Sequence, residues 1–141
     1  FKNRVKINIS VNCFCPPSLH SFTALDKSPR QAANRGCFHL VNNGIPFKNA
    51  VKTCDKEESI ITSIHDDEKQ FFITGLVSQI GPKQKYWLGY QNTGNGWNWT
   101  DNSNSPYNNW DTSNNQPNTN GEKYECAYAV QTVGFNTEWF V

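Results

Sequence analysis

The sequence predicts an α+β fold in which two helices pack on small antiparallel sheets with a long polar loop region. Two segments in the first half of the chain carry apolar residues at helical spacing. The second half contains short apolar segments separated by turn residues, which is typical of strands. Between two of these strands lies an Asn-rich run from Ser103 to Glu122, whose composition is that of a loop.

The N-terminal residues predict a strand. Val5, Ile7, Ile9 and Val11 alternate with polar residues, so residues 1–14 are expected to form an N-terminal extension strand. From Cys15 to Cys37 we expect a long, partly irregular hairpin. The 141 residues fit a single domain over 1–141, and no internal repeat or second domain is visible.

Two helices are predicted next. The first spans Pro46–Glu58, because Pro suits a first helical turn and apolar residues fall on one face of this segment. The second spans Ser63–Ile80, with Ser63 and Asp66 in the pattern of a capping box and Gly81-Pro82 as its end. The buried positions expected on the two helices are Phe47, Ala50, Val51 and Cys54, and then Phe71, Phe72, Leu76 and Ile80.

Three strands are predicted in the second half. Tyr86–Tyr90 is a short buried strand, and because Trp87 and Leu88 face opposite sides, the core lies on both faces or the strand bends. "GWNWTD" is another strand, with Trp97 and Trp99 on one face. Glu125–Gln131 is the final predicted strand.

Composition excludes several classes of protein. The formal net charge is +1, with 13 Lys plus Arg against 12 Asp plus Glu and no basic stripe, which gives no basis for nucleic-acid binding. No apolar run approaches the roughly 20 residues of a membrane helix. The three histidines share no ligand spacing with each other or with the cysteines, which disfavours zinc.

The cysteine content indicates a secreted, extracellular protein. Five cysteines occur in a short chain, together with two glycosylation acceptor triplets, Asn8-Ile9-Ser10 and Asn98-Trp99-Thr100. Because five is an odd number, at least one cysteine has no disulfide partner within this sequence.

The segment Gln116-Pro117-Asn118 stands out within the polar loop. Taken alone, it fits an ordinary Asn-rich loop with a turn proline. A flexible linker would use Gly and Ser more evenly, so the two amides that flank Pro117 need a further explanation.

From about Cys15 onward the chain resembles the C-type lectin-like family. The resemblance rests on Cys54 after "FKNAVKTC", on "YWLGY", on "GWNWTDNSNSPYNNW", and on Gln116-Pro117-Asn118 eight residues before Cys126. It implies the C-type lectin-like fold, a glycan or glycoprotein as ligand and a cis Gln116–Pro117 bond. A cis bond turns the two flanking amides to one side, so their oxygens can converge on calcium while their N–H groups donate to sugar hydroxyls. No enzymatic activity is expected, because no catalytic set is visible in the sequence.

The resemblance also implies site residues. Gln116 and Asn118 match two calcium ligands, whereas "FNT" at 135–137 replaces the family's Trp-Asn-Asp motif and Tyr124 replaces a carboxylate. With few carboxylates, calcium is expected to bind weakly or not at all. The implied calcium ligands are Gln116, Asn118, Asn136 and Thr137, and the implied carbohydrate-binding residues are Gln116, Asn118, Glu122, Glu125 and Asn136.

The resemblance implies a disulfide between Cys15 and Cys37. It implies that Cys54 and Cys126 do not bond to each other but to cysteines near the C-terminus, and it offers no partner for Cys13. Because those C-terminal cysteines and the family's last core strand would follow Val141, we expect the protein to continue beyond this residue.

Two functions remain open at this point. The first is a secreted, carbohydrate-binding domain that uses the Gln-Pro-Asn loop. The alternative is a calcium-independent module that binds a protein partner with the same loop face, which the substitutions at Tyr124 and Thr137 favour. A small secreted hydrolase is a third possibility, for which no catalytic set is visible in the sequence.

Overall fold

The computed structural model describes residues 2–6, 20–22, 36–41, 44–56, 59–119, 125–134 and 136–141. The chain divides into two compact units, residues 1–61 and 62–141. The prediction of one domain over 1–141 with an extension strand stays a prediction. Cys13 and Cys15 lie outside the described residues, and the side chain of Cys37 is not described, so the predicted disulfide stays untested.

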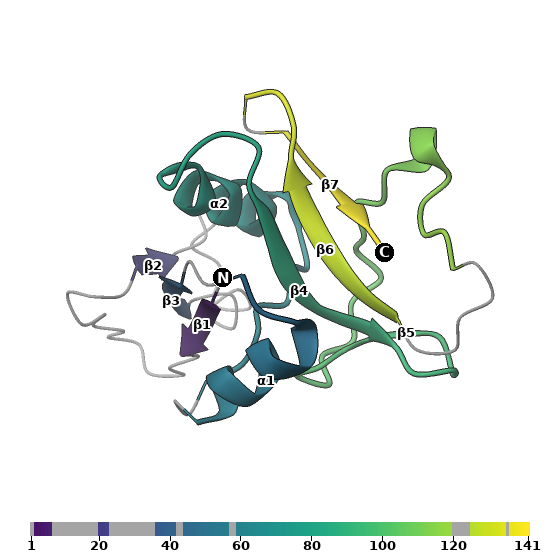
Figure 1. Cartoon of the computed structure of the whole chain (residues 1–141), viewed down its shortest axis with the longest axis horizontal. Coiled ribbons are helices and arrows are strands. Elements are labelled where there is room, and N and C mark those ends of the chain that lie inside the picture. Colours follow the sequence, from purple (N-terminus) through teal and green to yellow (C-terminus); the bar gives the residue numbers. More distant parts are fainter. Residues whose placement is uncertain are drawn as a thin grey trace, which may run out of the picture. The chain divides into compact units, whose positions relative to one another are not determined.

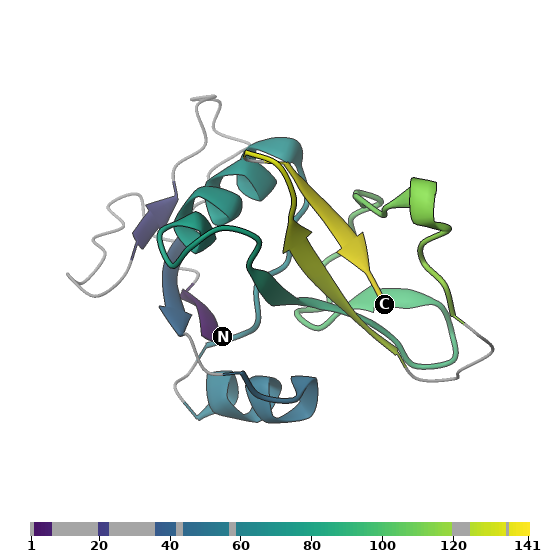
Figure 2. The same ribbon diagram turned by 45° about the horizontal axis from the view of Figure 1, so that its top comes forward.

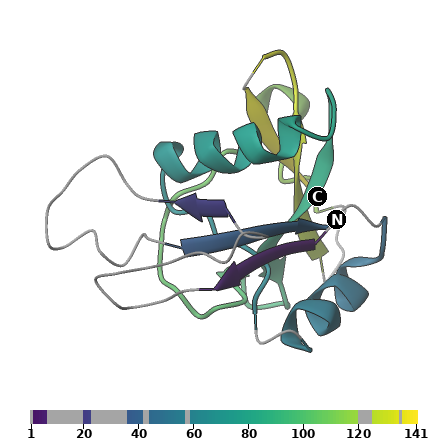
Figure 3. The ribbon, with the colours of Figure 1, turned by 90° about the vertical axis from the view of Figure 1, so that its left-hand side faces the viewer.

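The first unit contains a three-stranded antiparallel sheet and one helix. Strands β1 (Lys2–Lys6), β2 (His20–Phe22) and β3 (Gly36–Val41) are arranged with β3 in the centre (Figure 3). Helix α1 (Phe47–Asp55) follows Pro46, whose carbonyl accepts hydrogen bonds from the N–H groups of Asn49 and Ala50. Ala50 and Cys54 are buried, as the helical spacing predicted.

The second unit packs helix α2 (Asp67–Ser78) on a four-stranded antiparallel sheet (Figures 1 and 2). The strand order is β5-β4-β6-β7, with β4 at Lys85–Asn92, β5 at Trp97–Trp99, β6 at Glu125–Gln131 and β7 at Thr137–Phe140. The predicted strands at Tyr86–Tyr90 and Glu125–Gln131 are confirmed. Glu125–Gln131 is nevertheless not the final strand, because β7 follows it.

Strand β4 is irregular in the segment for which the sequence predicted either burial on both faces or a bend. The register with β6 shifts between Trp87 and Gln91. In this interval the Gly89 N–H donates to the carbonyl of Thr62 (2.9 Å), and the Gly89 carbonyl accepts from the N–H of Thr100 (2.7 Å). The backbone therefore leaves the β4–β6 ladder locally, and Leu88 and Gly89 are both buried.

Helix α2 begins later than predicted, and it buries the predicted Leu76 but not Phe71. Its N-cap is Asp66, whose Oδ1 accepts from the N–H of Lys69 (2.7 Å). Ser63, the predicted cap, instead donates to Asp101 Oδ2 (2.6 Å). Phe71 is 60% exposed, so its predicted burial is wrong. The helix residues that are buried are Lys69, Gln70, Ile73, Thr74, Leu76 and Val77.

A buried amide explains why polar residues occupy this face. Gln70 Oε1 accepts from Trp139 Nε1 (2.7 Å), and Gln70 Nε2 donates to the hydroxyl of Tyr86 (2.8 Å). The hydroxyls of Thr74 and Thr137 are 2.7 Å apart. Burial raises the pKa of Tyr86 to about 12, so its phenol is neutral at ordinary pH. Hydrogen bonds thus connect α2 to both β4 and β7.

Replacing Gln70 tests this connection. Gln70→Ala leaves Trp139 Nε1 and the Tyr86 hydroxyl without this partner inside the core, and each unsatisfied buried group costs about 1–3 kcal/mol. We expect a large drop in the free energy of unfolding, measured by urea denaturation. The control Gln79→Ala alters an exposed amide at the end of the same helix and should change stability little. Equal effects of the two substitutions would contradict the role assigned to Gln70.

Candidate functional site

The polar loop is attached to the outer edge of β7. Trp139 N donates to the carbonyl of Asn109 (2.8 Å), and Asp111 N donates to the carbonyl of Trp139 (3.1 Å). Trp110 thereby forms a parallel bridge with Trp139, and Asn109 Nδ2 donates to the carbonyl of Thr137. The edge of β7 is therefore occupied by the loop, whose position depends on that strand.

Asp111 shapes the next part of the loop. Its side chain caps a short 3₁₀ turn, η2 (Thr112–Asn114), by accepting from Ser113 Oγ (2.5 Å), Asn114 N (3.2 Å) and Asn114 Nδ2 (2.5 Å). These hydrogen bonds, from Ser113 first, lower the pKa of Asp111, so the carboxylate stays charged. The Asp111 carbonyl then accepts from the N–H of Gln116 (3.0 Å), which carries the turn on to the Gln-Pro-Asn segment.

The Gln116–Pro117 bond is cis, as predicted. Gln116 Oε1 accepts from the N–H of Asn118 (3.2 Å) and from the N–H of Val141 (3.1 Å). The side-chain oxygen that was expected to bind calcium therefore already accepts two backbone hydrogen bonds. The orientation of the Gln116 amide is fixed by protein groups, while Asn118 is exposed.

Strand register brings Glu125 to the same end of the sheet as Gln116. Tyr128 of β6 faces Phe140 of β7, so Glu125 lies just beyond the end of β7, where Val141 contacts Gln116. We call this region, defined by Gln116, Asn118, Glu125 and Val141, the loop end of the sheet. Glu125 is 8% exposed, and its Oε2 has no hydrogen-bond partner within the described part of the chain. Such an oxygen is an acceptor for a ligand that donates or for a cation.

The structure places Asn136 and Thr137 at the other end of β7. Gln116 contacts Val141, and the four residues of β7 lie between Val141 and Asn136, which are five residue steps or roughly 16 Å apart. The Thr137 side chain is 5% exposed and bonds to Thr74 in the core. Because a calcium ion is held by oxygens at about 2.3–2.6 Å, neither residue belongs to a site with Gln116.

The residues that do adjoin Gln116 were missed in the sequence. The tryptophan that contacts the loop backbone is Trp139, and Phe140 and Val141 follow it. The family resemblance had instead matched the expected Trp-Asn-Asp motif to "FNT" at residues 135–137. The sequence offers Trp139 as a second match for the tryptophan of the motif. Choosing Trp139 over Phe135 requires the register of β7 against β6, which the sequence does not show. Apolar side chains thus stand where an amide and a carboxylate were expected.

These residues fit a calcium ion poorly. The orphaned Glu125 oxygen is compatible with a cation, but Gln116 Oε1 is already bonded, and Val141 offers no side-chain oxygen. No group of three His, Cys, Asp or Glu side chains suited to a metal occurs in the described ranges. Glu122 and Tyr124 lie outside these ranges, so the predicted sugar contact of Glu122 and the predicted loss of a ligand at Tyr124 stay untested.

A cluster of aromatic rings supports the loop end of the sheet. Tyr90 stacks on Trp99 with ring centroids 4.3 Å apart, and Trp97 meets Trp110 edge-on at 4.8 Å. Trp139 contacts Trp99 and Trp110, in both cases at 5.8 Å. Trp97 and Trp99 belong to one cluster, as their predicted common face required. Edge-to-face and offset contacts of this kind add to the stabilisation from burial.

A second set of hydrogen bonds holds the start of the loop beside α2. Ser103 Oγ donates to Asp101 Oδ1 and lies 2.8 Å from His65 Nε2, and Tyr107 donates its hydroxyl proton to Asp67 Oδ1 (2.7 Å). In a hydrolase triad the imidazole lies between the serine and the carboxylate. Here Ser103 lies between His65 and Asp101, so its proton goes to the carboxylate and the set does not activate a nucleophile.

Two further predicted features are located by the structure. Cys126 has a half-buried thiol whose pKa is raised by burial and by Glu125, and it is not joined to Cys54. Asn98 of the second glycosylation triplet is exposed on β5.

Neither α1 nor α2, the helices in the described residues, is long and apolar enough to cross a membrane.

Comparison with known proteins gives concordant matches. A sequence model described as the Lectin C-type domain matches residues 43–139. The C-type mannose receptor 2 of Mus musculus is 31% identical over 81 residues, which cover 56% of this chain and 5% of the receptor. The C-type lectin CEL-I from Cucumaria echinata has a TM-score of 0.69 at 19% identity, covering 89% of this chain and 86% of that chain. A calcium-independent type II antifreeze protein has a TM-score of 0.64 at 21% identity, covering 90% of this chain and 83% of that chain.

The surroundings of His65 give a pH-dependent prediction. Burial, and then the nearby Lys69, lower its pKa below the model-peptide value of 6.5. The unfolded chain therefore takes up this proton first, so stability falls as pH drops below about 6.5 towards the lower folded pKa. We expect His65→Gln to lose less stability than the wild type between neutral and mildly acidic pH, measured by urea unfolding. Equal losses in the two proteins would show that His65 does not contribute.

The cap of η2 gives a prediction about loop order. Asp111→Ala removes the acceptor for Ser113 and Asn114, so we expect faster hydrogen exchange at the amides of Asn114 and Gln116. Asp55→Ala, which alters an exposed aspartate at the end of α1, serves as the control. Unchanged exchange at Gln116 in the Asp111 variant would show that the loop is held by other contacts.

Proposed function

We propose, because this chain belongs to the family of C-type lectin domains, that it binds carbohydrate at the loop end of the sheet and acts outside the cell. The observation that carries the proposal is the fixed amide of Gln116 beside exposed Asn118 and the orphaned oxygen of Glu125. Amide N–H groups donate to sugar hydroxyls, and a carboxylate accepts from them. Glu122 is proposed as a further acceptor.

Calcium has a minor part in this proposal. The described ligand set contains one carboxylate, Glu125, and the Gln116 oxygen is already bonded. Asn118 and Glu125 would be left to hold a calcium ion, which when bound would supply a Lewis-acidic partner for sugar hydroxyls. Calcium affinity rises with the number of charged ligands, so we place it at the weak, millimolar end of natural sites.

The alternative function is binding of a protein partner by the same face. It is favoured by the apolar Val141 beside Gln116 and by the half-buried rings of Trp97 and Trp110, which contact each other. Apolar and aromatic side chains are enriched in the cores of protein interfaces. A catalytic function has no such support, since Ser103 is bonded to Asp101 rather than activated by His65.

A glycan array tests the primary proposal. The wild type should bind glycans, and Gln116→Ala or Asn118→Ala should weaken this binding by about tenfold, equivalent to about 1.4 kcal/mol. The control Asn104→Ala changes an exposed amide of the same loop and should leave binding intact. Absence of any glycan signal, together with capture of a defined protein lost on Val141→Asp, would favour the protein-binding alternative.

Calcium titration calorimetry tests the assignment of the loop end. Wild-type protein should bind calcium no tighter than about millimolar. Val141→Asp adds a carboxylate beside Gln116 and should tighten calcium binding. Thr137→Asp should instead destabilise the fold, because it buries a carboxylate against Thr74, and should not tighten calcium binding. Micromolar binding by the wild type would show that Glu122 or Glu125 already completes a site.

A further inference from the structure

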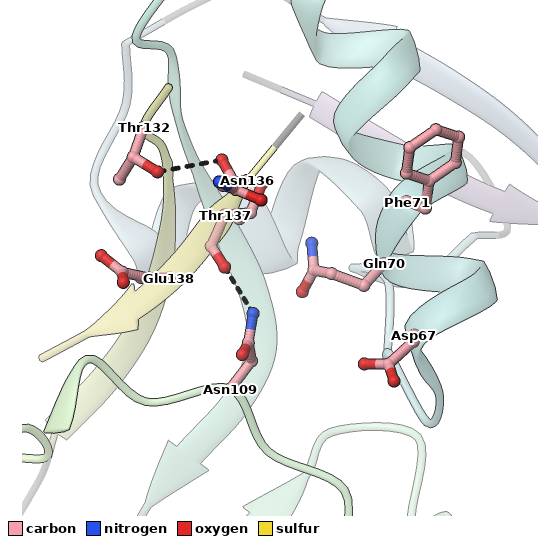
Figure 4. Close-up of a pocket in the computed structure, with 8 residues that line it drawn as sticks. All are labelled: Asp67, Gln70, Phe71, Asn109, Thr132, Asn136, Thr137 and Glu138. Carbon is pink, nitrogen blue, oxygen red and sulfur yellow. Dashed lines mark hydrogen bonds between the residues drawn. The ribbon is translucent and has the colours of Figure 1, made fainter. Parts of the chain in front are cut away.

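A pocket of about 330 Å³ lies between α2 and β7, on the side of Asn136 rather than that of Gln116 (Figure 4). Its volume is at the lower end of the range of small-ligand pockets. The residues that line it are Asp67, Gln70, Phe71, Asn109, Thr132, Asn136, Thr137 and Glu138. Asn136, which the family resemblance had assigned to the calcium site, is thus part of a different cavity.

Protein hydrogen bonds fix the floor of this pocket. Gln70 and Thr137 are 6% and 5% exposed, and both belong to the buried network that joins α2 to the sheet. Asn109 is held by its hydrogen bond to the Thr137 carbonyl. These groups need little further ordering when a ligand binds, which reduces the entropic cost of association.

The rim carries the chemistry expected for a sugar. Phe71 is 60% exposed on α2 and offers an aromatic surface for the C–H face of a pyranose ring. Asp67, whose carboxylate extends from α2 towards β7 in Figure 4, can accept from hydroxyls, and the exposed amide of Asn136 can donate to them. The lining contains no Lys, Arg or His, so nothing in it selects an anion.

We propose that this pocket is a second saccharide-binding site, which holds one sugar unit without a metal ion. The class of ligand, a saccharide, rests on the proposed function. The pocket itself uses none of the loop-end residues that carry that function. Gln116 adjoins Val141 at one end of β7, and Asn136 precedes the strand at the other, roughly 16 Å away. One glycan chain could extend over both sites, or each could bind a terminal sugar.

Amide NMR spectra recorded in the presence of EDTA test the proposal. D-galactose, D-mannose and N-acetyl-D-glucosamine are each titrated to tens of millimolar. At least one should shift the amide signals of Asn136 and Asn109. Phe71→Ala should weaken this binding by about tenfold. Alanine preserves the helix, and Phe71 is exposed, so the variant should fold, which its thermal melting would verify.

Two comparison variants separate this site from the loop end. Val133→Ala removes another exposed apolar side chain, 82% exposed and outside the pocket lining, and should leave metal-free binding unchanged. Gln116→Ala weakens binding at the loop end but should leave the metal-free shifts of Asn136 and Asn109 unchanged, because Gln116 is not part of the pocket lining. Shifts of Asn136 and Asn109 that disappear in Gln116→Ala would overturn the second site, because the sugar would then be bound at the loop end. Metal-free shifts confined to Trp97 and Trp110 would overturn it in favour of the aromatic cluster. No shift with any of the three sugars would also overturn it.

Discussion

The arrangement of the second unit depends on one buried amide, that of Gln70. Its oxygen accepts from Trp139 of β7 and its nitrogen donates to Tyr86 of β4, so one side chain of α2 sets the distance to two strands. A buried amide is stable only if its polar atoms are paired, which makes this arrangement more specific than apolar packing alone. The position of β7 then determines where the polar loop can attach.

The position of β7 in turn fixes the position of the polar loop. The backbone of Trp139 bonds to Asn109 and Asp111, and its ring packs on Trp99 and Trp110. The loop is therefore held by backbone hydrogen bonds along the edge of β7 and by the packing of the Trp110 ring on the ring of Trp139. Only after these contacts does the chain turn through Asp111 to Gln116, so the geometry of the loop end follows from the core rather than from the loop sequence alone.

The sequence predicted the elements whose signals are local and failed where tertiary pairing decides. The strands around Leu88 and Ala127 follow from short apolar segments, and the cis bond before Pro117 followed from the family resemblance. The buried face of α2 was mispredicted, because Gln70 is polar yet lies in the core, and hydrophobic periodicity assigns such residues to the surface. The family resemblance assigned Asn136 to one site with Gln116, whereas strand register places it at the opposite end of β7.

The same contacts explain how a loop of this type keeps its shape with a poor metal site. In a calcium-bound loop the ion can order several oxygens that would otherwise repel one another. Here the charged oxygens of Asp111 are paired with Ser113 and Asn114, and the oxygen of Gln116 is paired with the backbone of Val141. Internal hydrogen bonds thus perform the ordering that the ion would provide. The cost is that those oxygens are no longer available to a metal, so recognition falls to amide N–H groups, to Glu125 and to aromatic surfaces, none of which requires calcium.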